Sequence, residues 1–215
     1  MENHQIFPFD ILYEIGIHLD LNHVANLTRT NRENSKLFAL LIPHYKIIIS
    51  EISEECPSEI TNKITQLIRV GANYPVIWRH FNDLKRVSFD NIFNQSIAHL
   101  PDKITHLTLG DKFNFPIYHL PLSLTHLKFG HKFNQSIDDL PKKLTHLTLG
   151  YKFNLSIDKL PNELTHLTLG HSFDQSIDNL PKSLTHLTLG HKFKHSIDNL
   201  PNGLLRDWVV KIKKF

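Results

Sequence analysis

The amino-acid sequence predicts an α+β fold, in which a short helical part at the N-terminus precedes a solenoid of stacked units with a parallel sheet. Phenylalanine recurs every 20 residues in the second half of the chain, at Phe93, Phe113, Phe133, Phe153, Phe173 and Phe193. Leu-Pro pairs keep the same 20-residue step from Pro101 to Pro201. A fixed period of this length indicates stacked supersecondary units, each too small to bury a core of its own.

The N-terminal part carries apolar residues at helical spacing. Pro8 suits the first turn of a helix, where its missing N–H group is not needed. A helical face follows at Ile11, Leu12, Ile15 and Leu19, and a second short apolar stripe at Leu21, Val24 and Leu27. We therefore expect residues 1–45 to form a small helical domain.

Residues 46–82 have two interpretations, a connecting segment or a degenerate repeat. Residues 59–70 have apolar residues at helical spacing, with Gly71 as a stop. The hexapeptide at residues 62–67 also resembles residues 102–107, two periods of 20 residues later. The sequence leaves both a helix and a decayed repeat open for this segment.

Residues 83–204 contain the recognisable units, and each unit predicts one short strand. Alternation along the strand should place Leu167 and Leu169 in the core and His166 and Thr168 outside. The glycine that follows permits a turn that side chains would hinder. The pattern fades after Gly203, so we expect residues 205–215 to form a terminal cap, as an open stack requires.

Composition excludes several classes of function. The chain has 215 residues and a formal net charge of +3, too small to argue for nucleic acid or a membrane surface as partner. One cysteine, Cys56, excludes an internal disulfide framework. The N-terminus lacks an apolar secretion signal. The expected location is the cytoplasm, the host cytoplasm if the protein is viral, with the nucleus as the alternative.

The repeat predicts ladders of identical side chains along the stack. One row consists of the strand histidines His106, His126, His146, His166 and His186. An even ladder is not a closed cage of three or four ligands, so we expect no metal site there and no cofactor elsewhere. A second ladder, of asparagines from Asn94 to Asn154, is expected to be structural and to be interrupted at Asp174 and Lys194.

The positions that vary while their neighbours repeat are the candidates for recognition of a target protein. Directly after the glycines stand Asp111, His131, Tyr151, His171 and His191. Lys128 replaces a threonine that recurs on the histidine face. Together with the histidine row, these residues form the predicted target-binding strip.

Two resemblances to known families follow from these motifs. The repeat, with its Leu-Pro-x-x-Leu-Thr-His-Leu phrase and segments such as Phe93–Ile97 and Phe133–Ile137, resembles the FNIP repeat, a branch of the leucine-rich repeats. The N-terminal part resembles an F-box through Phe7, Pro8, Ile11, Leu12, Ile15, Leu19, Val24 and Leu27.

The F-box resemblance implies a function. These eight residues would bind a Skp-type adaptor, and through it the core of a cullin-RING ubiquitin ligase. The repeats would then hold the target protein beside the conjugating enzyme. The alternative is a repeat scaffold for protein–protein interaction without a ligase. In either case we expect no enzyme, because the serines of the repeat recur in several units and no glycine-rich phosphate loop is present.

Overall fold

A computed structural model describes residues 83–204 and three strands outside that range, β1 (Ile47–Ile48), β2 (Gln66–Val70) and β9 (Val209–Lys211). The helical domain expected over residues 1–45 lies outside the described residues. The described part of the chain contains no helix with the length and apolar character needed to cross a bilayer.

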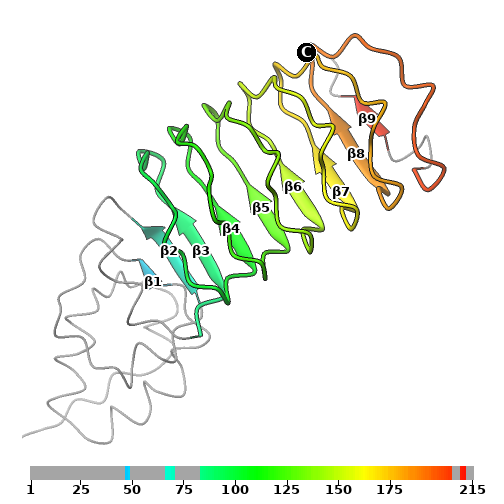
Figure 1. Cartoon of the computed structure of the whole chain (residues 1–215). Helices are drawn as coiled ribbons and strands as arrows, with labels where there is room; N and C mark the ends of the chain where they lie inside the picture. Colours follow the sequence, from blue (N-terminus) through cyan, green and yellow to red (C-terminus); the bar gives the residue numbers. More distant parts are fainter. Residues whose placement is uncertain (1–46, 49–65, 71–82, 205–208, 212–215) are drawn as a thin grey trace, which may run out of the picture.

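A parallel sheet with the strand order β1 to β9 runs the length of the described structure (Figure 1). Its remaining strands are β3 (Arg86–Phe89), β4 (His106–Thr108), β5 (His126–Lys128), β6 (His146–Thr148), β7 (His166–Thr168) and β8 (His186–Leu189). Strand neighbours from β3 to β8 pair with a shift of one 20-residue unit, as His106 opposite His126 illustrates. The predicted solenoid of 20-residue units with a parallel sheet is confirmed.

The 20-residue step extends beyond the recognisable units at the N-terminal side, with one shift of register in β2 between Leu67 and Val70. Residues 66–70 form a strand rather than a helix, and Gln66 lies opposite Arg86, again 20 residues apart. Ile47 in β1 lies opposite Leu67 by the same step. At the other end Leu187 pairs with Val209, a step of 22 residues. The fading of the sequence pattern after Gly203 therefore coincides with a longer connection to one further strand.

The core consists of rows of identical apolar side chains, one per unit. Leu167 and Leu169 are 1% and 0% exposed, whereas His166 and Thr168 are partly exposed, as the alternation predicted. Phe113, Phe133, Phe153 and Phe173 are fully buried. Consecutive rings from Phe93 to Phe193 stack with centroids 6.0–6.3 Å apart. Each unit thus completes the core of the next.

The glycines are needed for close approach between units. A Cβ atom built on Gly150 would overlap the carbonyl oxygen of Gly130, and one built on Gly170 would overlap that of Gly150. Neither glycine has the left-handed backbone conformation that would favour glycine at a turn. The glycine does begin a turn, since the N–H of Phe153 donates to the carbonyl oxygen of Gly150, and a side chain there is excluded by the preceding unit rather than by the backbone conformation.

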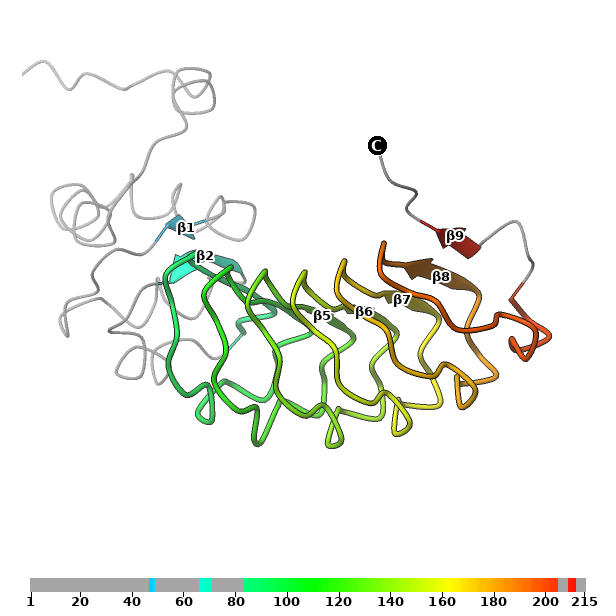
Figure 2. The same cartoon turned by 90° about the horizontal axis from the view of Figure 1, so that it is seen from above.

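This arrangement gives the molecule two kinds of surface. Strands lie along one side of the stack, and the connecting loops return along the other (Figure 2). Because every unit repeats the same path, an outward side chain at one position forms a row along the whole solenoid.

Candidate functional site

The strand histidines form a continuous stack on the outer face of the sheet. From His106 to His186 the ring centroids of neighbours lie 4.0–4.1 Å apart, with interplanar angles of 8–11°. All five side chains are partly buried. The structure thus brings the predicted histidine row together as one surface, which we call the histidine row.

A threonine before each histidine fixes the orientation of the ring. The hydroxyl oxygen of Thr105 lies 2.9 Å from Nδ1 of His106, and the same distance recurs in the next four units. Each hydroxyl also donates to the carbonyl oxygen of the preceding unit, at 3.0–3.1 Å. Nδ1 is therefore occupied, and Nε2 is the nitrogen of His106 that remains for contacts outside the protein.

Burial and neighbouring charges lower the pKa of four histidines of the row, from His106 to His166. Desolvation, followed by the charges of His126 and Arg86, lowers the pKa of His106 to about 4. Desolvation is also the largest cause that lowers the pKa of His126, His146 and His166. These four rings are thus neutral near pH 7, which favours contacts through hydrogen bonds and ring edges rather than through charge.

The described residues contain no group of three or more His, Cys, Asp and Glu side chains that could hold a metal ion. Stacking explains this for the histidine row. Parallel rings direct their Nε2 lone pairs in parallel, whereas a tetrahedral metal needs ligand lone pairs that converge.

The residues after the glycines form a second row, at the turn that follows each strand. The ring centroids of His131 and Tyr151 lie 4.9 Å apart, those of Tyr151 and His171 4.4 Å, and those of His171 and His191 5.1 Å. Asp111 begins this row, and its carboxylate accepts a hydrogen bond from the backbone N–H of His131. Lys128 lies within the sheet, opposite Thr108 and Thr148, and is exposed.

The predicted target-binding strip therefore consists of two parallel rows and one lysine. Its role in binding stays a prediction. The predicted adaptor-binding residues, from Phe7 to Leu27, lie outside the described residues.

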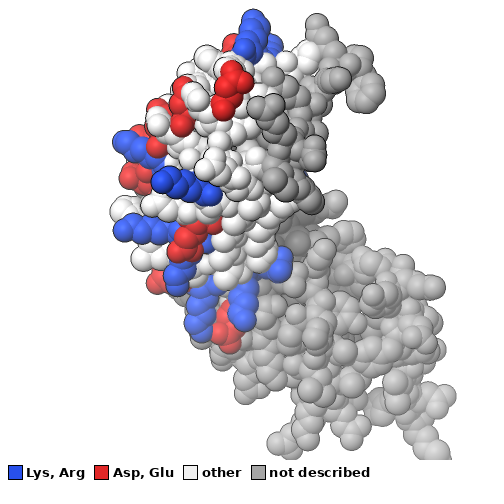
Figure 3. Space-filling model, turned by 90° about the vertical axis from the view of Figure 1, so that its right-hand side faces the viewer, with Lys and Arg blue, Asp and Glu red and all other residues white. Residues whose placement is uncertain are grey.

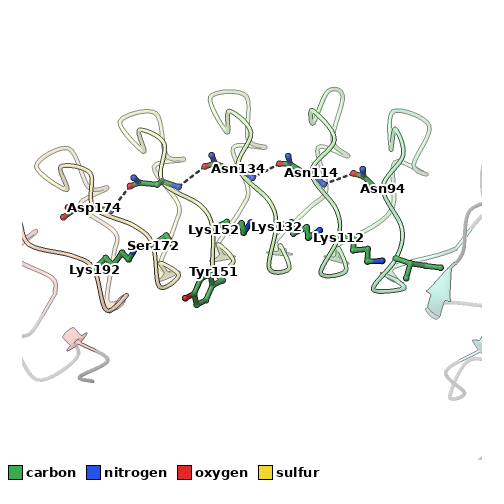
Figure 4. Close-up of a pocket in the computed structure, with 12 residues that line it drawn as sticks. Asn94, Lys112, Asn114, Lys132, Asn134, Tyr151, Lys152, Ser172, Asp174 and Lys192 are labelled. Carbon is green, nitrogen blue, oxygen red and sulfur yellow. Dashed lines mark hydrogen bonds between the residues drawn. The ribbon is translucent and has the colours of Figure 1, made fainter. Parts of the chain in front are cut away.

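A third surface, which was not predicted from the sequence, is a shallow groove of about 1010 Å³ beside the second row (Figure 4). Lysines and asparagines line most of it. The lysine row consists of Lys112, Lys132, Lys152 and Lys192, with Ile92 and Ser172 at the equivalent positions of two units. The signal was present in the sequence, because lysine recurs two positions after four of the glycines.

The asparagine row on the groove is a hydrogen-bonded ladder. Oδ1 of Asn94 accepts from the backbone N–H of Asn114 at 2.8 Å, and each following asparagine repeats the contact at 2.8–2.9 Å. Asp174 does not interrupt the ladder as expected, because its carboxylate accepts from the N–H of Lys194 at 3.0 Å. A carboxylate offers the same acceptor oxygen as an amide, so the ladder ends only at Lys194.

Comparisons with known proteins agree with this architecture. A solved crystal structure of CroV588, described as a novel circular LRR protein, is similar with 35% sequence identity and a TM-score of 0.60. The similarity covers 77% of this chain and 29% of that one, so the chain spans less than a third of the length of that protein. No curated protein matches the sequence significantly.

The family comparison is specific to the repeats. The FNIP Repeat family matches residues 93–132, 133–172, 153–192 and 173–205, which together span more than half of the 215-residue chain. The matched segments contain the phenylalanine row from Phe93 to Phe193, the asparagine ladder and the whole histidine row. The chain therefore belongs to the FNIP repeat family.

Proposed function

We propose that this chain is a non-catalytic scaffold that binds a partner protein along the outer rows of its FNIP solenoid. The observation that carries the proposal is the separation of constant and variable positions. The core rows keep the same residue types from unit to unit, whereas the row after the glycines changes from Asp111 through His131 and Tyr151 to His171. Repeat proteins use a constant frame of this kind to present a variable binding surface.

The geometry of the two rows supports recognition rather than chemistry. Most of their rings stack on the rings of neighbouring units, so a partner meets a surface that loses little conformational freedom on binding. Tyr151 is 42% exposed, which gives the second row an aromatic contact of the kind enriched at protein interfaces.

A matched pair of variants tests this proposal. The strip variant changes the second row and carries His131→Ser, His171→Ser and His191→Ser. The control variant changes exposed residues before the strands and carries Lys142→Ala, Glu163→Ala and Lys182→Ala. Partners captured from cell extract are identified by cross-linking and mass spectrometry. A partner cross-linked to this face, kept by the control and lost by the strip variant, is the expected result. Equal retention by both variants would overturn the proposal.

The finer proposal is a substrate-recognition subunit of a cullin-RING ubiquitin ligase. The support for it is the F-box resemblance of residues 7–27 in the sequence. The test is size-exclusion chromatography of the full chain mixed with a purified Skp-type adaptor. One joint peak, lost in a Leu12→Glu and Ile15→Glu variant that keeps its β-sheet circular dichroism, is expected. Two separate peaks for the unmodified chain would overturn the ligase proposal and leave the scaffold proposal in place.

A further inference from the structure

The groove is bordered by the lysine row and by the asparagine ladder. Figure 4 shows the asparagines along one side of it and Lys112, Lys132, Lys152 and Lys192 along the other. All four lysines are exposed. None of the described carboxylates forms an ion pair with any of them. Their charge is therefore available to a ligand.

The asparagine side adds neutral donors. Because Oδ1 of each asparagine faces the N–H of the next unit, the orientation of the amide is fixed. Oδ1 of Asn114 accepts a further hydrogen bond from Gln135 Nε2 at 3.2 Å. The ladder thus uses the acceptor of the amide and leaves the Nδ2 hydrogens of Asn94, Asn114 and Asn134 outside it.

The charge along the groove is uneven. Asp174 is the carboxylate among its lining residues, and it lies in the unit where Ser172 replaces lysine. His195 Nε2 lies 3.7 Å from its Oδ1. The most cationic stretch consequently runs from Lys112 to Lys152. An anionic ligand should lie there, with Asp174 opposing its extension toward the C-terminal units.

The neighbouring row argues against single-stranded nucleic acid as the ligand. Proteins that bind such strands offer free aromatic faces on which bases stack. Tyr151 is the aromatic residue of the groove, and both faces of its ring are covered. Its ring centroid lies 4.9 Å from that of His131 and 4.4 Å from that of His171. On the face drawn in Figure 3, basic and acidic side chains are also interspersed rather than gathered into one cationic field.

The spacing suits an extended peptide. Neighbouring strands in a sheet lie about 4.8 Å apart, so the four unit steps from Lys112 to Lys192 span roughly 19 Å. An extended chain covers that distance with about six residues. Lysine carries its charge on a flexible stem, so its ammonium group can follow carboxylates that do not share the spacing of the units.

We propose that this groove binds an extended acidic segment of a partner protein, with its carboxylates on Lys112, Lys132 and Lys152 and its backbone carbonyls on the asparagine amides. The proposal rests on the function proposed above, a protein-binding solenoid, and adds a site and the chemistry of its ligand.

The test uses fluorescence anisotropy of the full chain with a labelled peptide of about eight glutamates, and a glutamine peptide of equal length as its control. The groove variant is Lys112→Gln, Lys132→Gln and Lys152→Gln. The matched control variant, Lys142→Gln, Lys143→Gln and Lys182→Gln, removes the same charge at exposed positions that do not line the groove. Binding of the glutamate peptide should weaken about fivefold or more in the groove variant and little in the control.

A variant with higher expected affinity is included because a gain in binding cannot result from loss of the folded structure. Asp174→Asn keeps an acceptor oxygen for the ladder and removes the negative charge from the groove. It should bind the glutamate peptide about two- to fivefold more tightly. Equal weakening by both lysine variants, no detectable binding by the parent chain, or tighter binding of an oligothymidylate probe would each overturn the proposal.

The outcome is separable from that of the proposed function. The strip variant leaves every lysine and asparagine of the groove in place. If the peptide fails to bind while a partner protein is still lost by the strip variant, the groove proposal fails and the scaffold stands.

Discussion

The Thr125 hydroxyl lies 2.9 Å from Nδ1 of His126 and 3.0 Å from the carbonyl oxygen of Thr105, so one side chain links a ring to the preceding unit. The same pair recurs in each unit from Thr105 to Thr185. The histidine row is thus ordered by its threonines as well as by ring stacking, and its orientation is a property of the repeat.

Thr125→Val removes this link while it keeps the shape of the side chain. We expect a loss of about 1–2 kcal/mol in the free energy of unfolding, because Nδ1 of the partly buried His126 loses its partner. Urea denaturation followed by circular dichroism measures the change. Thr168→Val is the matched control, since Thr168 lies on the same face and has no side-chain hydrogen bond among the described residues. Equal losses in the two variants would contradict the role of the link.

The histidine row should make stability depend on pH. The folded-state pKa of His106, about 4, lies below its value of 6.5 in an unfolded chain, so the unfolded state binds more protons between these values. The contribution of His106 is complete above about pH 6.5 and is lost as pH falls toward about 4, and the lowered pKa of His126, His146 and His166 acts in the same direction. The melting temperature should therefore fall over this window.

A variant that lacks three histidines of the row is the control for this pH effect. His126→Asn, His146→Asn and His166→Asn removes three rings whose pKa is lowered by burial. The melting temperature of this variant should vary less between pH 6.5 and 4 than that of the parent chain. Parallel pH profiles would show that other groups dominate.

Gly150→Ala should be strongly destabilising. Its Cβ would overlap the carbonyl oxygen of Gly130, which is backbone and cannot move without displacing the stack. We expect a loss of about 3 kcal/mol or more in the free energy of unfolding. Gly203→Ala is the control, because its Cβ would lie 3.4 Å from the nearest atom, the carbonyl oxygen of Lys182. Chemical denaturation of both variants decides whether close approach is the reason for the repeated glycine.

The asparagine ladder should accept aspartate but not alanine. Asn134→Asp keeps an acceptor for the N–H of Asn154, as Asp174 does for Lys194, so stability should change little. Asn134→Ala leaves that N–H without its partner and should cost about 1 kcal/mol. Similar unfolding curves for the alanine variant and the parent chain would mean that water replaces the amide without loss.

Much of the fold was predictable because the units repeat. Leu167 and Leu169 follow strand alternation, and Phe173 recurs at the same step as its neighbours, so one unit predicts the others. The role of Gly150 was not predictable from a single unit, since the clash that excludes a side chain comes from the unit before it. The strand at Gln66–Val70 was ambiguous for a related reason, because its apolar residues fit a helix until its pairing with β3 is known.

The candidate surfaces were predictable only in part. Regular spacing indicated the histidine row and the second row, but not that most of their rings stack, with centroids 4.0–4.9 Å apart. The groove was missed because Lys112 and Asn114 stand on either side of the buried Phe113 in the sequence, and the pattern does not say that the two rows border one hollow.

The constant step of 20 residues from β3 to β8 has a consequence for how such chains diversify. If recombination inserts or deletes one whole unit, the strand pairing and the core rows between adjacent units keep the same pattern. Such an event lengthens or shortens both the ring rows and the lysine groove by one strand spacing, about 4.8 Å. The number of repeat units thus sets the length of these surfaces. A change in that number would change the length of the segment that the proposed groove can hold, while the core of each unit stays the same.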